Sequence, residues 1–220
     1  MPTFSHFWTT LIDTRSIFFD AMVVTLQLTV VSILLGVVIG LVFALLKISG
    51  VKPLGWLSDI YVYLIRGTPL IVQIFILYFG MSNIFLIPDF WAASIALAVH
   101  NGAYIAEIFR GSIQSIEKGQ AEAGRSLGMT AGLTMRRIIL PQAFRRALPP
   151  LGNQFIIGLK DSSLAAFISM NELFNIATTY GSNNFDEMTY LLIVAIYYLI
   201  LVLLLTVAVN LLERKLRTSD

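Results

Sequence analysis

The 26 residues from Ala21 to Leu46 contain no charged side chain, and no other feature restricts the possible folds of this chain so strongly. At about 1.5 Å of rise per residue, a helix of this length exceeds the ~30 Å hydrocarbon core of a bilayer. The 220-residue chain is 57% hydrophobic and only 13% charged, which leaves too little polar surface for a soluble globule. Because lipid offers no hydrogen-bond partners to the backbone, the sequence predicts an all-α integral membrane protein.

Four later apolar segments predict further transmembrane helices, so that residues 1–220 form a single transmembrane domain. Gly36 and Gly40 have the spacing of small residues at close helix contacts, although simple tolerance of glycine in lipid is an alternative. Residues 1–20 mix aromatic and polar side chains, which favours either a helix or turn at the membrane interface or a mobile terminus. The expected spans are about 21–46, 57–80, 90–106, 151–169 and 188–212.

The second of these spans is interrupted by the sequence Arg66–Gly67–Thr68–Pro69. Such a break frees backbone groups, which is acceptable only where protein or a water-filled cavity covers them. Interrupted helices therefore favour a transport path. The alternative is that Arg66 lies at the membrane interface and marks the true start of the helix.

The fourth span contains Lys160 and Asp161 in its middle, so its crossing of the membrane needs independent support. Each charge at bilayer depth costs about 2.5 to 3.5 kcal/mol on insertion scales. Five spans place 13 of the 15 Lys and Arg residues on one side, which is then the cytoplasmic side. The sequence therefore predicts five transmembrane helices, with the N-terminus outside and the C-terminus cytoplasmic. The polar loop 107–150 is expected in the cytoplasm, and residues 171–187 are expected to form a polar linker outside.

The loop 107–150 is charged but regularly patterned. The third transmembrane helix is expected to continue to Lys118 and to end at Gly119. Gly119 and Gly128 then bracket a short helix over residues 120–127. The loop therefore predicts a short rod held outside the membrane.

A second helix is expected in the same loop after this rod. Thr130 is expected to cap its N-terminus, and Pro141 is expected to end it. Pro149 and Pro150 would then mark the return of the chain toward the bilayer.

A small set of polar residues at membrane depth are candidates for a transport path. Polar side chains there must find partners, so they rarely face lipid. A lone histidine is more often a packing residue, and a Lys–Asp pair can equally form salt bridges between subunits. Adjacent residues point about 100° apart on a helix, so this pair needs partners from another helix, a second subunit or a substrate. The candidates are Thr68, His100, Asn101, Lys160 and Asp161.

Several functions are excluded by what the sequence lacks. There is no G-x-x-x-x-G-K-[ST] sequence, no G-x-S-x-G elbow and no His–Glu metal constellation, so neither catalytic nor metal-binding residues are predicted. The absence of cysteine removes a thiolate metal site, and the net charge of +2 without a basic arm argues against a nucleic-acid partner. Two classes remain, which are a self-sufficient, gradient-driven secondary carrier and the membrane half of an energised assembly. Five spans without an internal repeat favour a dimer.

Within the loop, Glu122–Ala123–Gly124, then Gly128, then Ile138–Ile139–Leu140–Pro141 resembles the EAA signature of membrane permease subunits in binding-protein-dependent ABC importers. Gly124 replaces the alanine of the third signature position. Further blocks across the chain resemble the polar amino acid branch of this family: Arg66–Gly67–Thr68–Pro69–Leu70, Ala103–Tyr104–Ile105–Ala106–Glu107, Leu140–Pro141–Gln142–Ala143, Leu148–Pro149–Pro150–Leu151–Gly152–Asn153 and Lys160–Asp161–Ser162–Ser163–Leu164.

The resemblance implies a type I ABC importer permease fold and a prokaryotic cell membrane. It implies two cytoplasmic ATPase subunits, a second permease that is either a copy or a homologous chain, and an extracytoplasmic solute-binding protein. ATP and Mg would bind the ATPase partner, and no cofactor is expected on this chain. The cargo would be a polar L-amino acid, with cystine as the specific suggestion. The residues that would couple to the ATPase are Gln120, Ala121, Glu122, Ala123, Gly124, Arg125, Leu127 and Gly128.

Overall fold

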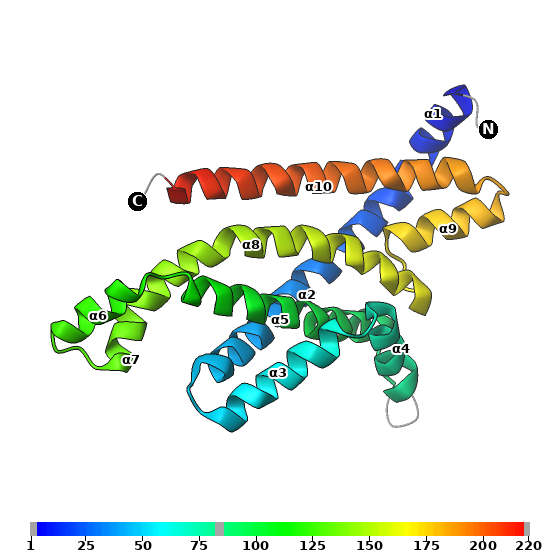
Figure 1. Cartoon of the computed structure of the whole chain (residues 1–220). Helices are drawn as coiled ribbons and strands as arrows, with labels where there is room; N and C mark the ends of the chain where they lie inside the picture. Colours follow the sequence, from blue (N-terminus) through cyan, green and yellow to red (C-terminus); the bar gives the residue numbers. More distant parts are fainter. Residues whose placement is uncertain (1–3, 82–85, 218–220) are drawn as a thin grey trace.

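The computed structural model describes residues 4–81 and 86–217, and these residues form helices and short connections without a strand (Figure 1). Two long helices, α2 and α10, flank a layer built from α5 and α8, and the small helices α6 and α7 project from one end. The elements are α1 (Phe4–Asp13), α2 (Arg15–Ile48), α3 (Lys52–Arg66), α4 (Leu70–Met81), α5 (Asp89–Gln114), α6 (Lys118–Ser126), α7 (Ala131–Thr134), a π turn η1 (Met135–Ile139), α8 (Leu140–Asp161), a 3-10 segment η2 (Ser162–Ile168), α9 (Leu173–Asn183) and α10 (Glu187–Arg217).

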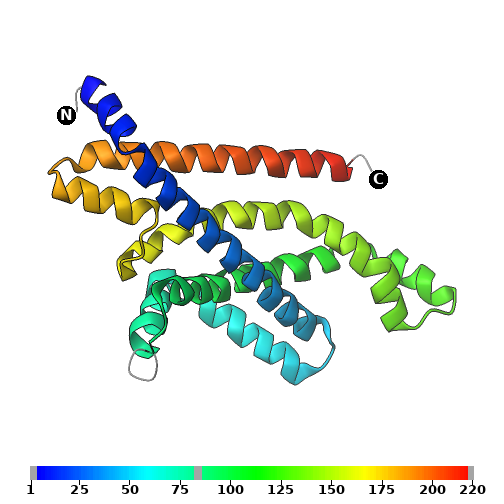
Figure 2. The same cartoon turned by 180° about the vertical axis from the view of Figure 1, so that it is seen from behind.

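The crossing of α2 and α5 forms the centre of the molecule, and Figure 2 shows α2 running obliquely across this layer. Gly36 and Gly40 are both buried on the face of α2 that packs against α5. A β-carbon at Gly40 would lie only 2.7 Å from Cγ2 of Ile105. The expected close helix contact is therefore confirmed, and the alternative of lipid-facing glycines is wrong.

The interruption expected in the second span is a sharp bend. The helices α3 and α4 meet at 98° across the break at residues 67–69. Residues 57–80 therefore do not form a straight helix. Within the described residues, α2, α5 and α10 are long and apolar enough to cross a membrane, and the bent α3–α4 pair raises the number to four if it counts as one span. The five spans and their orientation stay predictions.

The helix after Thr130 does not end at Pro141. Thr130 does cap it, since its Oγ1 accepts a hydrogen bond from the amide of Leu133. The chain then passes through η1 into α8 and stays helical to Asp161. In η1 the amide of Leu140 bonds to the carbonyl of Met135, five residues back. This wider turn relieves the clash that the proline ring would make in a regular α-helix, so the helix continues.

The same continuity changes the role of the later prolines. Pro149 and Pro150 lie inside α8 instead of marking the start of a new segment. The segment expected as a span over residues 151–169 is consequently the second half of α8 followed by η2.

The linker 171–187 contains a helix, α9, whose N-terminus is capped by a buried carboxylate. Glu172 has no exposed surface, and its two oxygens accept hydrogen bonds from the amides of Phe174 and Asn175 at 2.9 and 2.7 Å. The hydroxyl of Tyr198 donates a third hydrogen bond at 3.0 Å. Burial is the largest influence on this group and raises the pKa of Glu172 from 4.5 to about 7, although the three hydrogen bonds oppose the increase.

This raised pKa predicts a pH-dependent stability. As pH rises from 4.5 to about 7, the carboxyl of Glu172 ionises in the unfolded chain before it ionises in the folded one. The folded state therefore loses roughly 3 kcal/mol relative to its stability at low pH. Thermal unfolding of the detergent-solubilised protein between pH 4 and 8 measures this loss.

The matched variants for that measurement are Glu172→Gln and Glu187→Gln. Glutamine resembles the protonated acid, so the Glu172 variant is expected to lose most of the pH dependence. Glu187 is exposed at the start of α10, so its variant is expected to follow the original profile. An unchanged profile in the Glu172 variant would contradict the assignment.

Candidate functional site

The short helix of the loop is α6, and its boundaries differ slightly from the expected ones. The helix α5 ends at Gln114, and Gly119 lies within the first turn of α6 instead of ending the preceding helix. Gly119 is exposed and its added β-carbon would meet nothing within 4 Å, so no cap requires a glycine there. Gly128 follows the end of α6 with a φ of +80°, as expected for a residue that terminates a helix.

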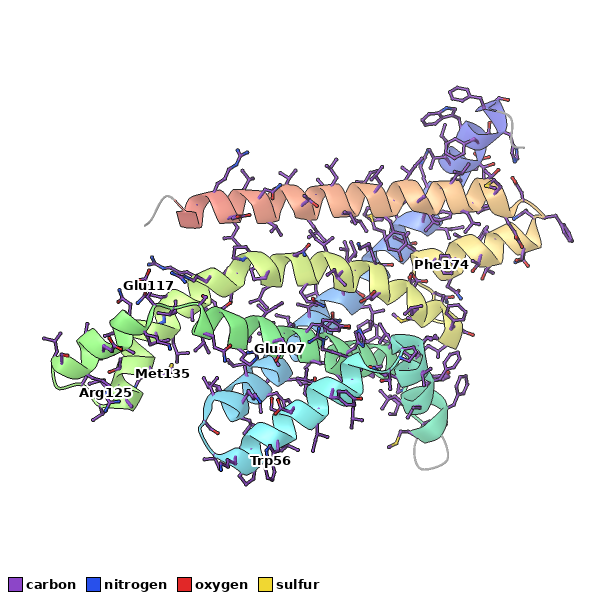
Figure 3. The ribbon with its side chains drawn as sticks, viewed as in Figure 1. Trp56, Glu107, Glu117, Arg125, Met135 and Phe174 are labelled. Atoms are coloured by element: carbon purple, nitrogen blue, oxygen red, sulfur yellow. The ribbon has the colours of Figure 1, made fainter. Side chains whose placement is uncertain are left out.

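The helix α6 has one face packed on its own loop and one face open. Ala121 and Gly124 face inward, onto a small apolar cluster that includes Ile116, Ile139 and Ala143. The outward face is exposed, and the side chain of Leu127 at its end is 83% exposed. Figure 3 shows Arg125 at the outer end of the molecule, far from the α2 and α5 crossing. The residues exposed on and beside this face are Gln120, Glu122, Ala123, Arg125, Leu127 and Gly128.

The small size of Gly124 is used inside the loop. A β-carbon there would lie 2.9 Å from Cδ1 of Ile138 and 3.0 Å from Cγ2 of Thr134. The absence of a side chain therefore lets α6 approach the segment that leads into α8. Among the small residues of the signature, Ala123 and Gly128 are exposed.

Hydrogen bonds hold the loop around α6 together, and one of them reaches α6 itself. Nη1 of Arg146 on α8 donates to the carbonyl oxygen of Ser115, which follows α5, at 2.5 Å. Nε2 of Gln142 on α8 donates to the carbonyl of Ile138 at 2.9 Å and to Oε1 of Gln120 on α6 at 3.5 Å. The contact between Gln142 and Gln120 and the inward packing of Ala121 and Gly124 therefore link α6 to the segment that leads into α8.

At the break between α3 and α4, one glutamine connects two of the predicted path residues. Nε2 of Gln73 donates to the carbonyl oxygens of Ile65 and Thr68 and to Oγ1 of Thr68, at 2.8 to 3.1 Å. Oε1 of Gln73 lies 3.3 Å from Nδ1 of His100 on α5. The structure therefore brings Thr68 and His100 together through a residue that the sequence analysis did not select. The signal was present, since Gln73 is the only polar side chain between Leu70 and Leu77.

A cavity of about 330 Å³ lies beside this network. Its walls come from α3, α4 and α5 and are mostly apolar. Thr68 and Gln73 supply its polar groups. The break thus opens onto a hollow with a few convergent polar atoms, as small-molecule sites often do.

Asn101 does not share this hollow. It is fully buried, its Nδ2 donates to the carbonyl of Leu97, and its Oδ1 accepts from Nε2 of Gln154 at 2.8 Å. Its polar atoms are therefore satisfied between α5 and α8. In this conformation Asn101 packs between α5 and α8, and its place in a transport path stays a prediction.

Lys160 and Asp161 lie at the end of α8, apart from the Thr68 and His100 network. Lys160 is exposed and Asp161 is half-buried. Within residues 4–81 and 86–217, neither side chain forms an ion pair. Both interpretations of this pair, a substrate contact or a salt bridge between subunits, therefore remain.

These features define a class of protein, a helical membrane permease subunit with a short exposed helix in its polar loop. The family described as "Binding-protein-dependent transport system inner membrane component" matches residues 10–218 of the chain. The chain belongs to this family. It is the permease component of an amino acid ABC importer, and its homologues are transport components rather than enzymes.

Relatives of known description match nearly the whole chain. The L-cystine transport system permease protein TcyB of Bacillus subtilis is 45% identical over 87% of this chain and 83% of its own length. The arginine transport system permease protein ArtQ of the same organism is 37% identical over 91% and 93%. The glutamine transport system permease protein GlnP of Escherichia coli is 37% identical over 96% and 97%.

Solved structures show the same fold. An amino acid ABC transporter crystallised with histidines superimposes with a TM-score of 0.90 at 38% identity, over 94% of this chain and 97% of that chain. The MetNI methionine ABC transporter in an inward-facing conformation has a TM-score of 0.81 at 23% identity, over 93% of this chain and 98% of that chain. The type I ABC permease fold expected from the resemblance is therefore confirmed.

Proposed function

We propose that this chain imports a polar L-amino acid through a prokaryotic cell membrane and takes its energy from two cytoplasmic ATPase subunits that bind α6. One observation supports the proposal most directly. The inward face of α6 packs on its own loop, while the outward face presents Glu122, Arg125 and Leu127 without covering them. ATP and Mg would bind the partner, and closure of the ATPases would move α6 as a rigid body together with α8.

The proposed arrangement follows the charge distribution of the chain. The basic loop 107–150 and the C-terminus lie in the cytoplasm, and five spans form one transmembrane domain. A second permease, either a copy or a homologous chain, completes the path. A solute-binding protein delivers the amino acid from the other side.

The proposed substrate path uses Thr68, His100, Lys160 and Asp161. An amino acid carries one carboxylate and one ammonium group, so a path for it needs groups of both signs or polar atoms that replace water. Lys160 and Asp161 supply the two signs, and Gln73 holds Thr68 and His100 beside the cavity at the break. Asn101 supports this path only indirectly, by fixing α5 against α8.

The identity of the amino acid is proposed from the relatives. The compared permeases are described for cystine, arginine and glutamine, which are all polar amino acids. Cystine is the specific suggestion, because the TcyB match has the highest identity of the three. Binding of a panel of amino acids to the cognate solute-binding protein tests it, and a failure to bind cystine would overturn it.

Uptake into proteoliposomes distinguishes the importer from a gradient-driven carrier. The importer requires the ATPase, the binding protein and ATP, and it continues when proton and sodium gradients are collapsed. A carrier requires only this chain and a gradient. Uptake by the chain alone would therefore overturn the proposed function.

Replacing Lys160 with methionine tests the path. The substitution keeps most of the side-chain length and removes the charge, so we expect uptake to fall at least about tenfold while the complex still assembles. The measurements are initial uptake rates and co-purification of the subunits. Lys52→Met, which removes an exposed cation at the start of α3, is the matched control. Loss of assembly in Lys160→Met would instead support a salt bridge between subunits.

A further inference from the structure

A second and larger cavity lies on the other flank of α3. Its volume is about 770 Å³, within the range of small-molecule sites. It is open to the outside and is lined by the end of α2, by α3 and by the last turns of α5, and Figure 3 shows Glu107 of α5 in the space next to α3. The residues of its lining that matter for binding are Lys47, Asp59, Arg66, Tyr104, Glu107 and Arg110.

Two of the three cations in this cavity already have carboxylate partners. Nζ of Lys47 lies 2.6 Å from a carboxylate oxygen of Asp59, and Nη2 of Arg110 lies 2.6 Å from Oε2 of Glu107. Arg66 is different, because no carboxylate within the described parts of the chain pairs with it. Its guanidinium lies over the ring of Tyr104, 5.0 Å from the ring centroid.

The position of Arg66 leaves its guanidinium available to a ligand. Because the guanidinium lies over the Tyr104 ring and pairs with no carboxylate among the described residues, its N–H groups can donate hydrogen bonds to a ligand. A guanidinium edge matches the two oxygens of a carboxylate in a bidentate geometry. Of the three cations that line the cavity, Arg66 is the one without a carboxylate partner in the part of the chain that the structure describes, so a ligand carboxylate would complete its pairing.

The cavity also contains groups that favour an ammonium. Glu107 is within electrostatic range of Arg66 as well as of its partner Arg110. The carboxylates of Glu107 and Asp59 disfavour a ligand that carries only negative charge, such as a phosphate dianion. A molecule with one carboxylate and one ammonium satisfies both sets of groups.

We propose that this cavity is a second amino acid site, in which Arg66 binds the α-carboxylate and Glu107 lies toward the α-ammonium. It contains none of the path residues Thr68, His100 and Asp161. The inference rests on the proposed function, because the proposed orientation places Lys47 and Arg110 on the cytoplasmic side. The site would then hold an amino acid on the cytoplasmic side of the break between α3 and α4, where the amino acid is released.

Equilibrium binding of radiolabelled L-glutamine tests this site. The sample is the detergent-purified complex of permease and ATPase, without ATP and without the binding protein. Because the site contacts groups that all α-amino acids share, glutamine is expected to bind at millimolar concentration. Arg66→Gln is expected to weaken this binding roughly tenfold. Arg66→Lys is expected to weaken it less, because lysine keeps the positive charge but cannot form the two parallel hydrogen bonds of a guanidinium. L-Glutaminamide, which lacks the carboxylate, is expected not to compete.

Two control variants distinguish this site from a general effect of lost charge and from the proposed path. Lys52→Gln removes an exposed cation of α3 outside the cavity and is expected to bind glutamine normally. Lys160→Met disables the proposed path, so the glutamine binding that remains in this variant is assigned to the cavity. Equal melting temperatures of Arg66→Gln and the original protein would show that the variant is folded.

The outcomes that overturn the inference are specific. They are the absence of glutamine binding to Lys160→Met at millimolar concentration, and glutamine binding to Lys160→Met that survives the added substitution Arg66→Gln. The same measurement in nanodiscs of phosphatidylglycerol and of phosphatidylcholine provides a further outcome. If the Arg66-dependent glutamine binding is present in phosphatidylcholine nanodiscs and lost in phosphatidylglycerol nanodiscs, the cavity binds a lipid headgroup instead. None of these results depends on ATP-driven uptake, so the proposed function can fail while this site is confirmed, and the reverse.

Discussion

Leu127→Asp is expected to reduce ATP-driven uptake by at least about tenfold while the permease stays folded. Leu127 is 83% exposed at the end of α6, so its side chain contributes little to the stability of the isolated chain. Burying a leucine side chain in a partner contributes about 1.5 to 3 kcal/mol, and a buried aspartate without a partner adds a desolvation cost. The substitution therefore removes affinity for the ATPase without removing contacts within the permease.

Three measurements check this expectation. They are the initial rate of uptake into proteoliposomes, the amount of ATPase that co-purifies with the permease, and the melting temperature of the purified permease. Leu127→Met is the conservative control and is expected to retain most of the uptake, because it remains apolar and of similar volume. Glu122→Lys, on the same exposed face, is expected to show the pattern of Leu127→Asp. Normal uptake with Leu127→Asp would mean that α6 does not bind the ATPase through this face.

The parts of the fold that were predicted correctly depend on residues that act locally. Thr130 caps a helix through its own hydroxyl, and Gly128 adopts a positive φ that other residues avoid. The sequence Arg66–Gly67–Thr68–Pro69 breaks a helix because proline cannot donate a backbone hydrogen bond. These effects are contained within a few consecutive residues, so they can be inferred from the sequence.

The parts that were missed depend on partners far away in the sequence. Gln73 is polar in an apolar segment, but its role appears only when α4 folds back on Thr68 and approaches His100. Asn101 was expected in a path, and Gln154 on another helix satisfies it instead. Pro141 was expected to end a helix, and the π turn before it could not be inferred from local propensity. Glu172 was interpreted as part of a polar linker because the burial around it comes from α2 and α10.

The candidate site divides in the same way. The coupling residues of α6 were named from the signature. The structure adds which of these residues are exposed and which pack inside the loop. Ala121 and Gly124 pack inward, so substitutions there are expected to act on the loop itself. The residues that stay exposed for the proposed ATPase partner are Gln120, Glu122, Ala123, Arg125, Leu127 and Gly128. The division separates variants that damage the fold from variants that damage coupling.

Gly40→Leu is expected to prevent stable folding, because α2 and α5 touch most closely at this glycine. An added β-carbon would lie 2.7 and 2.8 Å from the Cγ2 and Cβ atoms of Ile105 and 2.9 Å from the backbone nitrogen of Ala106. The side chain of Ile105 can move only a little because it is fully buried, and the backbone of α5 cannot move without separating the two helices. Overpacking of this kind costs about 1 to 3 kcal/mol for a single methyl group, and more for a leucine.

Gly40→Ala gives a graded version of this test, measured as the melting temperature of the protein in detergent. The matched control is Gly55→Ala on α3, where an added β-carbon meets nothing within 4 Å and the higher helix propensity of alanine favours a small gain. Combining Gly40→Ala with Ile105→Ala removes one of the three close contacts, the one with Cγ2, and is expected to cost less than the sum of the two single variants, since residues in contact are not additive. The Cβ atom of residue 105 and the backbone nitrogen of Ala106 remain, so the rescue is expected to be partial. If Gly40→Ala were as stable as the original protein, α2 and α5 would have to lie further apart than in this structure. The helices α3, α4 and α8, which pack against α5, would then lack the close-packed centre described above.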